Sequence, residues 1–206
     1  MLIRLLLVRH GHVDGIDPPQ FRGRAELQLS SEGRWQADRT AARIRAGWPV
    51  ASVRTSPLGR CVETGAAIAR ACGVEPKVLP ELTDLDYGAW TLKMHDEVRA
   101  AEPALFALWR SRPDEVRFPG GESLQDLAAR VADALRGLAA APGGGAHVFV
   151  SHDSVVRVLL LQLLGMPLGA YRRFDPAPCG ICEAVIEDGA KHLVRVNETA
   201  HLESAT

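Results

Sequence analysis

The sequence predicts an α/β protein: a three-layer α/β/α sandwich with a mostly parallel central sheet. Apolar runs typical of buried strands, beginning with Ile3–Val8 and Val50–Thr55, alternate with longer segments of helical periodicity. Strands joined through helices pair in parallel, and helices then cover both faces of the sheet. The 206 residues, 47% of them hydrophobic, suffice for one large domain with a substantial core. Because no repeat or long interior linker divides the chain, we expect residues 1–206 to form a single domain.

Helix and strand signals follow one another through the first half of the chain. Ser30 and Ser31 precede a segment of helical periodicity, which predicts a helix start. A second helix is expected from about Leu58 to Cys72, because proline follows Ser56 and is favoured in a first helical turn. Further predictions are a strand at Val78–Leu79, a loop over Glu81–Trp90, and helices at Asp96–Ala101 and Ala104–Arg110.

The second half begins with a turn at Phe118–Ser123, followed by a strongly amphipathic helix. The apolar positions of that helix are Leu124, Leu127, Val131, Leu135 and Leu138. A glycine-rich loop at 142–145, a strand at His147–Val150 and a helix at Val155–Leu164 come next. Two β runs, Gly180–Ile186 and His192–Val196, flank the turn Glu187-Asp188-Gly189, and this spacing predicts a closing hairpin.

The composition and net charge indicate which classes of partner the protein is expected to bind. The formal net charge is −1 and the pI is about 6.7, so nothing in the charge balance predicts nucleic acid or an anionic membrane as a partner. The N-terminal apolar run is too short to span a bilayer, and the longest later run, Val155–Leu164, is interrupted by Arg157 and Gln162. No signal peptide is evident, and we expect a cytoplasmic protein.

The four cysteines are expected to be reduced in that compartment. Cys179 and Cys182 form a CxxC pattern, but no second CxxC or HxxxH supplies the further ligands that zinc requires. A redox CxxC opens a helix, whereas this one lies in a β run. We therefore interpret Cys179 and Cys182 as small core or strand residues, and we predict no metal site; the other two cysteines are Cys61 and Cys72.

Charged and imidazole side chains gather where the predicted strands end. They are Arg9 and His10 after the first strand, Arg60 after the second, Asp84 and Asp86 after the third, and His152 and Asp153 after the strand at His147–Val150. Open parallel sheets bind ligands outside the carboxyl ends of their strands. Two arginines, two histidines and a carboxylate that converge there predict an oxyanion pocket with a nucleophile and a proton donor.

A phosphate monoester fits such a pocket best. Its charge at neutral pH is close to that of two bidentate arginines, with opposite sign. An imidazole nitrogen can attack phosphorus, fixed cations stabilise the transition state, and a carboxylic acid can protonate the leaving alkoxide. This scheme requires no metal and no cofactor. The chain has no GxxxxGK[ST] loop, and Asp84-Leu85-Asp86 does not end an N-terminal strand, where Mg²⁺-dependent dehalogenase-type phosphatases carry their paired aspartates.

Four stretches resemble the histidine phosphatase superfamily, in its first, phosphoglycerate-mutase-like branch. They are "LLLVRHGH" at 5–12, "TSPLGRCVET" at 55–64, "FPGGESL" at 118–124 and "VSHDSVVRVLL" at 150–160, in the order of the family. The resemblance implies that His10 is the phosphorylated nucleophile. It implies that Arg9 and Arg60 bind the phosphoryl oxygens, and that His152 donates a hydrogen bond to the same group.

The resemblance leaves the proton donor open. Residues 82–88 fit the frame in which the family usually carries a glutamate, and Asp84 stands at that position. Asp153, directly after the second histidine, is the alternative, and Glu81 is a third candidate. Asp153 is also expected to pair with Arg157 at i,i+4. Glu122 either caps its helix or supports the pocket.

Departures from the family pattern bear on activity. Val13 and Ile16 stand where members often carry Thr and Asn, and His12 either lines the mouth of the site or is solvated. "FPGGES" is similar to α-ribazole-phosphatase-like members. We therefore predict hydrolysis of a small phosphorylated metabolite first, mutase-type transfer second, and a catalytically weak binding protein third. Residues 91–117 are expected to form a lid that decides specificity, and a homodimer is compatible with the sequence.

Overall fold

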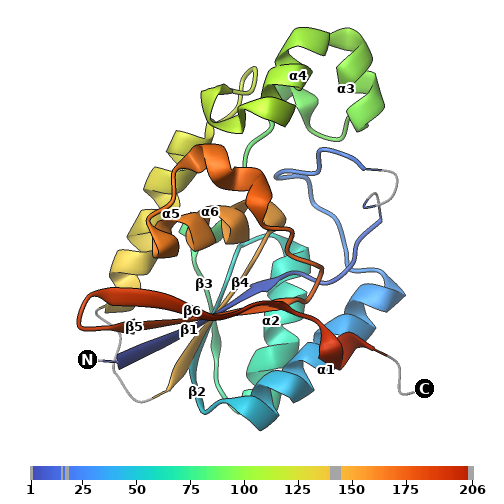
Figure 1. Cartoon of the computed structure of the whole chain (residues 1–206). Coiled ribbons are helices and arrows are strands. Elements are labelled where there is room, and N and C mark those ends of the chain that lie inside the picture. The colour runs from blue at the N-terminus through green and yellow to red at the C-terminus, as the bar shows by residue number, and fades with distance from the viewer. Residues whose placement is uncertain (1, 15, 17–18, 140–144, 204–206) are drawn as a thin grey trace.

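The computed structural model describes residues 2–14, 16, 19–139 and 145–203, and its centre is a six-stranded mixed sheet (Figure 1). The strands are β1 Leu2–Arg9, β2 Val50–Thr55, β3 Pro76–Val78, β4 Ala146–Ser151, β5 Ile181–Glu187 and β6 Ala190–Glu198. Their order is β3-β2-β4-β1-β5-β6. The first four pair in parallel, whereas β5 and β6 form an antiparallel hairpin beside β1. The predicted sandwich with a mostly parallel sheet is confirmed.

Helices cover both faces of this sheet. The α-helices are α1 Ser31–Gly47, α2 Gly59–Cys72, α3 His95–Ala101, α4 Pro103–Ser111, α5 Leu124–Ala139 and α6 Asp153–Leu164. Figure 1 shows α1 and α2 on one side of the sheet, α5 and α6 on the other, and α3 with α4 standing apart from both layers.

Short 3₁₀ turns join these elements. They are η1 Pro80–Leu82, η2 Gly88–Trp90, η3 Pro113–Glu115, η4 Leu168–Arg173 and η5 Ala200–Leu202. The predicted loop over Glu81–Trp90 therefore holds most of η1 and all of η2, and Pro80 begins η1 because its fixed φ suits a first helical position. Residues 142–144 of the predicted glycine-rich loop lie outside the described residues.

Strand β1 has apolar side chains on both of its faces. Leu5 and Leu7 belong to the core cluster on the α5 and α6 side, and Leu6 and Val8 belong to the cluster on the α1 and α2 side. Successive side chains of a strand point to opposite faces, so this central strand is buried on both sides. The unbroken apolar run in the sequence is the direct consequence.

The carboxyl edge of the parallel strands is enclosed by two segments that are paired with each other. The Phe21 N–H donates to the Lys93 carbonyl at 3.0 Å, and the Leu92 N–H donates to the Phe21 carbonyl at 2.7 Å. The segment after β1 and the entry to α3 thus form one wall. The predicted lid segment, residues 91–117, contains α3, α4 and η3 of this wall.

The cysteines are free thiols. Cys61, Cys179 and Cys182 are buried and Cys72 is partly buried. Within the described ranges, no group of three or more His, Cys, Asp or Glu residues is arranged to hold a metal ion. No helix among these residues is long and apolar enough to cross a membrane.

Candidate active site

His10 follows β1 directly and is 2% exposed. Its main-chain N–H donates to the Ser151 carbonyl of β4 at 2.8 Å, which fixes the residue to the sheet edge. Its ring Nδ1 lies 2.7 Å from the Gly11 carbonyl oxygen. Because a carbonyl oxygen can only accept, the ring proton is on Nδ1 and Nε2 keeps its lone pair.

The surroundings of His10 keep its ring neutral. Burial lowers its pKa well below 6.5, and the nearby His152, Arg60 and Arg9 lower that pKa further. The hydrogen bond to Gly11 acts in the opposite direction and is a smaller effect. A neutral imidazole with one free nitrogen is the form that can attack an electrophile.

Glycine at position 11 is required by close backbone contact. A Cβ on Gly11 would overlap the carbonyl oxygen of Gly33, in the first turn of α1. The Gly11 N–H also donates to the Thr64 hydroxyl of α2 at 3.2 Å. The glycine that follows His10 therefore allows the turn after β1 to pack tightly between α1 and α2.

Arg60, in the first turn of α2, is fully buried. Its guanidinium donates to the Gly23 carbonyl at 2.7 Å and to the Ala25 carbonyl at 2.8 Å. Its Nη2 also lies 3.1 Å from His152 Nδ1 and 3.4 Å from Asp84 Oδ2. Arg60 thus holds the segment after β1 in place. It also puts a fixed positive charge beside His152 and Asp84.

His152 is the N-cap residue of α6 and is buried. Its Nδ1 accepts from Arg60, so its proton is on Nε2, which donates to the Ser56 hydroxyl at 2.8 Å. Its ring meets the His10 ring edge-on, with centroids 5.3 Å apart. Burial, followed by Arg60 and Arg9, lowers the pKa of His152 well below 6.5.

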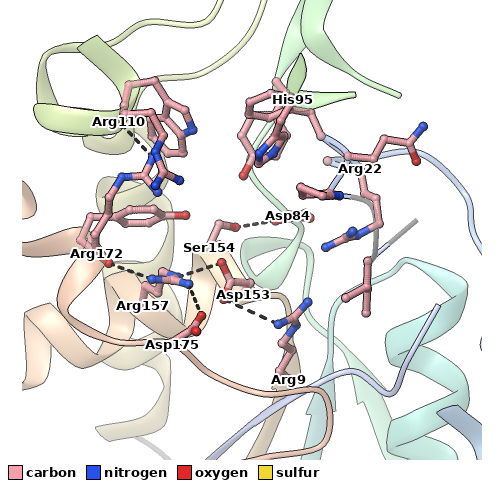
Figure 2. A pocket seen from close by; sticks show the side chains of 18 of the residues that line it. Arg9, Arg22, Asp84, His95, Arg110, Asp153, Ser154, Arg157, Arg172 and Asp175 are labelled. Atoms are coloured by element: carbon pink, nitrogen blue, oxygen red, sulfur yellow. Dashed lines mark hydrogen bonds and ion pairs between the residues drawn. The ribbon is translucent and has the colours of Figure 1, made fainter. Parts of the chain in front are cut away.

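A cavity of about 290 Å³ opens beside these groups (Figure 2). Four of the predicted site residues, Arg9, His10, Asp84 and Asp153, line it. Arg60 and His152 are not among its described lining residues, and they lie behind its wall. Arg9 donates to the Pro176 carbonyl at 2.8 Å, and its buried Nε has no hydrogen-bond partner among the described residues. Because Arg9 lines the cavity, its positive charge is placed to act on a bound oxyanion.

Two of the three candidate acids, Asp84 and Asp153, line the cavity. Asp84 Oδ1 accepts from the Leu85 N–H at 2.9 Å and from the Ser154 hydroxyl, whereas Oδ2 faces Arg60. Asp153 Oδ2 accepts from Arg157 Nε at 2.8 Å, which confirms the predicted i,i+4 pair. The other oxygen of Asp153 lies 3.8 Å from Arg9 Nη1. The third candidate acid, Glu81, lies in η1 and is not among the described lining residues.

Glu122 supports the loop that carries Asp84. Its Oε2 accepts from the Asp86 N–H at 3.1 Å and from Arg130 at 2.9 Å, and its Oε1 accepts from Arg24 at 2.6 Å. Arg130 also donates to the Asp84 carbonyl at 3.2 Å. The first turn of α5 is instead capped by the Ser123 hydroxyl, which accepts from the Asp126 N–H at 3.2 Å.

The remaining predicted positions lie on different sides of the site. His12 bonds through Nδ1 to the Ser30 hydroxyl at 2.8 Å and is not among the described cavity residues. Ser30 in turn accepts from the Gly33 N–H and caps α1. Val13 is buried in the core cluster under α1, whereas Ile16 lines the cavity. Apolar side chains thus occupy both positions where the family often has hydrogen-bonding groups.

Sequence reasoning missed several cavity residues. They include Arg22, Tyr87, His95, Trp109, Arg110, Ser154, Tyr171 and Arg172. None of these follows a strand end directly; Ser154 is the second residue of α6, next to the predicted His152-Asp153 pair. The signal that could have found Arg110 and Arg172 is the concentration of arginine in two segments, 110–117 and 172–173.

Acid should destabilise the folded protein before its carboxylates titrate. Burial lowers the pKa of His10 and His152, and the pKa of His95 falls to about 4 through burial and then through Arg110 and Arg172. In the unfolded chain each histidine titrates near 6.5. Between these values the unfolded state binds more protons, so the free energy of unfolding falls as the pH drops below about 6.5.

Urea unfolding midpoints at pH 7.5, 6.5, 5.5 and 4.5 measure this effect. We expect a steady decline that begins near pH 6.5. A His95→Asn variant should show a shallower decline down to about pH 4, because one of the contributing groups is removed. A wild-type midpoint that stays constant from pH 7.5 to 5.5 would contradict the assignment of neutral buried rings.

The fold and the site define an α/β sandwich that presents a neutral imidazole and arginines at the carboxyl edge of its parallel strands. The chain belongs to the histidine phosphatase superfamily (branch 1), whose family model matches residues 5–199. It is 31% identical over 180 residues to a protein of Enterobacter sp. (strain 638) named probable phosphoglycerate mutase GpmB, covering 87% of this chain and 83% of that protein.

Solved structures share the fold at lower sequence identity. The α-ribazole phosphatase from Shigella flexneri superimposes with a TM-score of 0.85 at 22% identity, over 95% of this chain and 96% of that one. A mycobacterial glucosyl-3-phosphoglycerate phosphatase has a TM-score of 0.88 at 24% identity, over 97% and 100%. The protein YhfR of Bacillus stearothermophilus has a TM-score of 0.91 at 23% identity, over 98% and 100%.

Proposed function

We propose that the protein hydrolyses a phosphomonoester of a small metabolite through a phosphohistidine at His10, without a metal ion. The observation that carries this proposal is the state of the His10 ring. Its Nδ1 is occupied by the Gly11 carbonyl, its pKa is lowered by burial and nearby cations, and the residue lines a cavity. Family membership supports the same reaction type.

In the proposed first step, His10 Nε2 attacks phosphorus, and the P–O bond to the leaving group breaks. The leaving oxygen takes the proton of the Asp84 carboxylic acid. Negative charge spreads over the phosphoryl oxygens, and Arg9 stabilises it from the cavity wall. Arg60 contributes its charge from behind the wall, and it also orients His152.

The second step returns the enzyme to its starting state. Water attacks the phosphorus of phospho-His10, and the Asp84 carboxylate accepts a proton from that water. The P–N bond breaks, inorganic phosphate leaves, and Asp84 is again an acid. Asp84 thus gives one proton in the first displacement at phosphorus and regains one in the second. The two steps need no reagent other than water.

A mutase reaction is the second candidate, and the relatives named probable phosphoglycerate mutase favour it. It shares the phospho-His10 intermediate but passes the phosphoryl group to a retained hydroxy acid rather than to water. Residues 91–117 bear on this choice, because His95, Trp109 and Arg110 of that segment line the cavity. We infer that this segment decides which molecule stays in the site.

The first test is hydrolysis of p-nitrophenyl phosphate in the presence of EDTA. We expect phosphate release at the same rate with and without the chelator, because His10, the arginines and one carboxylate supply every catalytic group. Loss of activity in EDTA would contradict the metal-independent route. A parallel assay with 3-phosphoglycerate and 2,3-bisphosphoglycerate decides between the candidates: efficient 2-phosphoglycerate formation would replace hydrolysis by transfer, and ligand binding without turnover in either assay would favour a binding protein.

A further inference from the structure

The cavity wall farthest from Arg9 in Figure 2 carries two arginines from separate elements. Arg110 comes from the last turn of α4, and Arg172 comes from η4. We call these two residues the outer arginine pair. Both line the cavity, and burial, followed by the positive charge of Arg110, lowers the pKa of Arg172. The fold has therefore brought two like charges together at one end of the cavity.

The outer arginine pair has no carboxylate partner among the described residues, since none lies within 4.0 Å of either guanidinium. Arg172 donates to the Trp109 carbonyl at 2.8 Å, and its guanidinium lies 4.7 Å from the centre of the Trp109 ring. These contacts fix its position but do not neutralise its charge. Both arginines also lower the pKa of the adjacent His95, so the positive potential extends over this wall.

At the Arg9 end of the cavity, carboxylates lie close to the arginines. Arg157 lies between Asp153 and Asp175, at 2.8 Å from each carboxylate, and Arg9 lies 3.8 Å from Asp153. Arg9 and the buried Arg60 already stand near His10, where a phosphoryl group would bind. The outer arginine pair thus adds positive charge beyond what one bound phosphate requires.

Guanidinium groups that lack a carboxylate partner and face a cavity are suited to bidentate binding of an oxyanion. Two of them held together repel each other, and a bound anion relieves that repulsion. A ligand that spans the cavity could then carry its phosphate at His10 and a second anion at the opposite wall. Three aromatic side chains that also line the cavity, Tyr87, Trp109 and Tyr171, would contact its uncharged part.

We propose that Arg110 and Arg172 bind a second anionic group of the substrate, so that the protein prefers phosphomonoesters that also carry a carboxylate or a second phosphate. This inference rests on the proposed phosphatase function and narrows it to one class of substrate. A carboxylate and a second phosphate would both bind as oxyanions. The choice of test compounds distinguishes between them.

Matched substrate pairs test the preference. O-phosphoserine and O-phosphoethanolamine differ by one carboxylate, and fructose 1,6-bisphosphate and fructose 6-phosphate differ by one phosphate. Charge-assisted hydrogen bonds predict a kcat/KM ratio of roughly 10- to 100-fold in favour of the doubly anionic member of at least one pair. The double variant Arg110→Gln/Arg172→Gln should lower that ratio to below about threefold.

The control is Arg173→Gln, which removes the same charge from an exposed arginine of η4 that is not among the described cavity residues. It should keep the wild-type ratio. Equal ratios in wild type and the double variant, or an equal loss in the control, would overturn the inference. A preference confined to one pair identifies the anion as carboxylate or phosphate.

Binding to the His10→Ala protein separates this inference from the proposed function. Calorimetry with the same four compounds needs no turnover. Tighter binding of the doubly anionic members, abolished by the double arginine substitution, supports the outer site even if the wild-type protein hydrolyses none of them. Hydrolysis without any discrimination in rate or binding supports the phosphatase and rejects the outer site.

Discussion

Replacing His10 with alanine is expected to lower kcat/KM for p-nitrophenyl phosphate by roughly 10³- to 10⁶-fold. The substitution removes a buried imidazole whose ring is neutral and whose Nδ1 is tied to the Gly11 carbonyl, which leaves Nε2 as the proposed attacking atom. Arg9 and Asp84 would remain in the cavity, but without an acceptor for the phosphoryl group. Initial rates measure the loss. Rapid acid-free quenching with ³²P-labelled substrate measures the intermediate, which should be labile to acid and stable to alkali in wild type and absent from the variant.

His192→Ala is the matched control, because His192 is exposed on β6, far along the chain from the site. It should retain both the wild-type rate and the labelled intermediate. Thermal unfolding of all three proteins shows whether His10→Ala is folded. A folded His10→Ala protein that kept more than about a tenth of the activity would assign the nucleophile elsewhere.

Local sequence signals predicted most of the elements, for identifiable reasons. The strand at Val50–Thr55 has the predicted bounds, and the helix predicted to start near Ser30 begins at Ser31, with Ser30 as its N-cap. Proline, glycine and serine act within one helical turn, so a short window of sequence contains their effect. The neighbours of β1 could not be predicted in this way, because β4 and β5 are distant in the chain and pair through the whole strand length.

The site was predictable only at the level of strand ends. The rule for open sheets correctly brought Arg9, His10, Asp84 and Asp153 to one cavity. It could not show that Arg60 and His152 lie behind the wall, since that depends on side-chain packing. The carbonyls of the loop after β1 capture the Arg60 guanidinium, and Arg60 then fixes the tautomer of His152.

The outer arginine pair shows the same limit more clearly. Arg110 and Arg172 are 62 positions apart, and neither belongs to a motif. The contact of η4 with α4, through Arg172 and Trp109, brings them to one wall. The residues proposed for the chemistry follow strand ends, whereas those proposed for specificity come from the segments that cover the strand ends.

The identity of the proton donor can be decided from its dependence on the leaving group. Asp84→Asn is expected to lower kcat for an alkyl phosphate by roughly 10²- to 10⁴-fold, because an alkoxide must be protonated as it leaves. The same substitution should cost much less with p-nitrophenyl phosphate, since p-nitrophenolate is a stable anion. Asn keeps the size of the side chain, and its oxygen can still accept from Leu85 and Ser154.

Asp153→Asn makes the same change at the competing acid. Asp153 is engaged by Arg157 at 2.8 Å and faces Arg9, so its charge is used to hold two arginines of the cavity wall. Its substitution should therefore affect alkyl and aryl phosphates to a similar degree, through substrate binding. The leaving-group dependence is the decisive readout, because a general loss of packing would lower both rates together. If Asp153→Asn shows the selective loss with alkyl phosphates and Asp84→Asn does not, the donor is Asp153, and Asp84 serves to position Arg60.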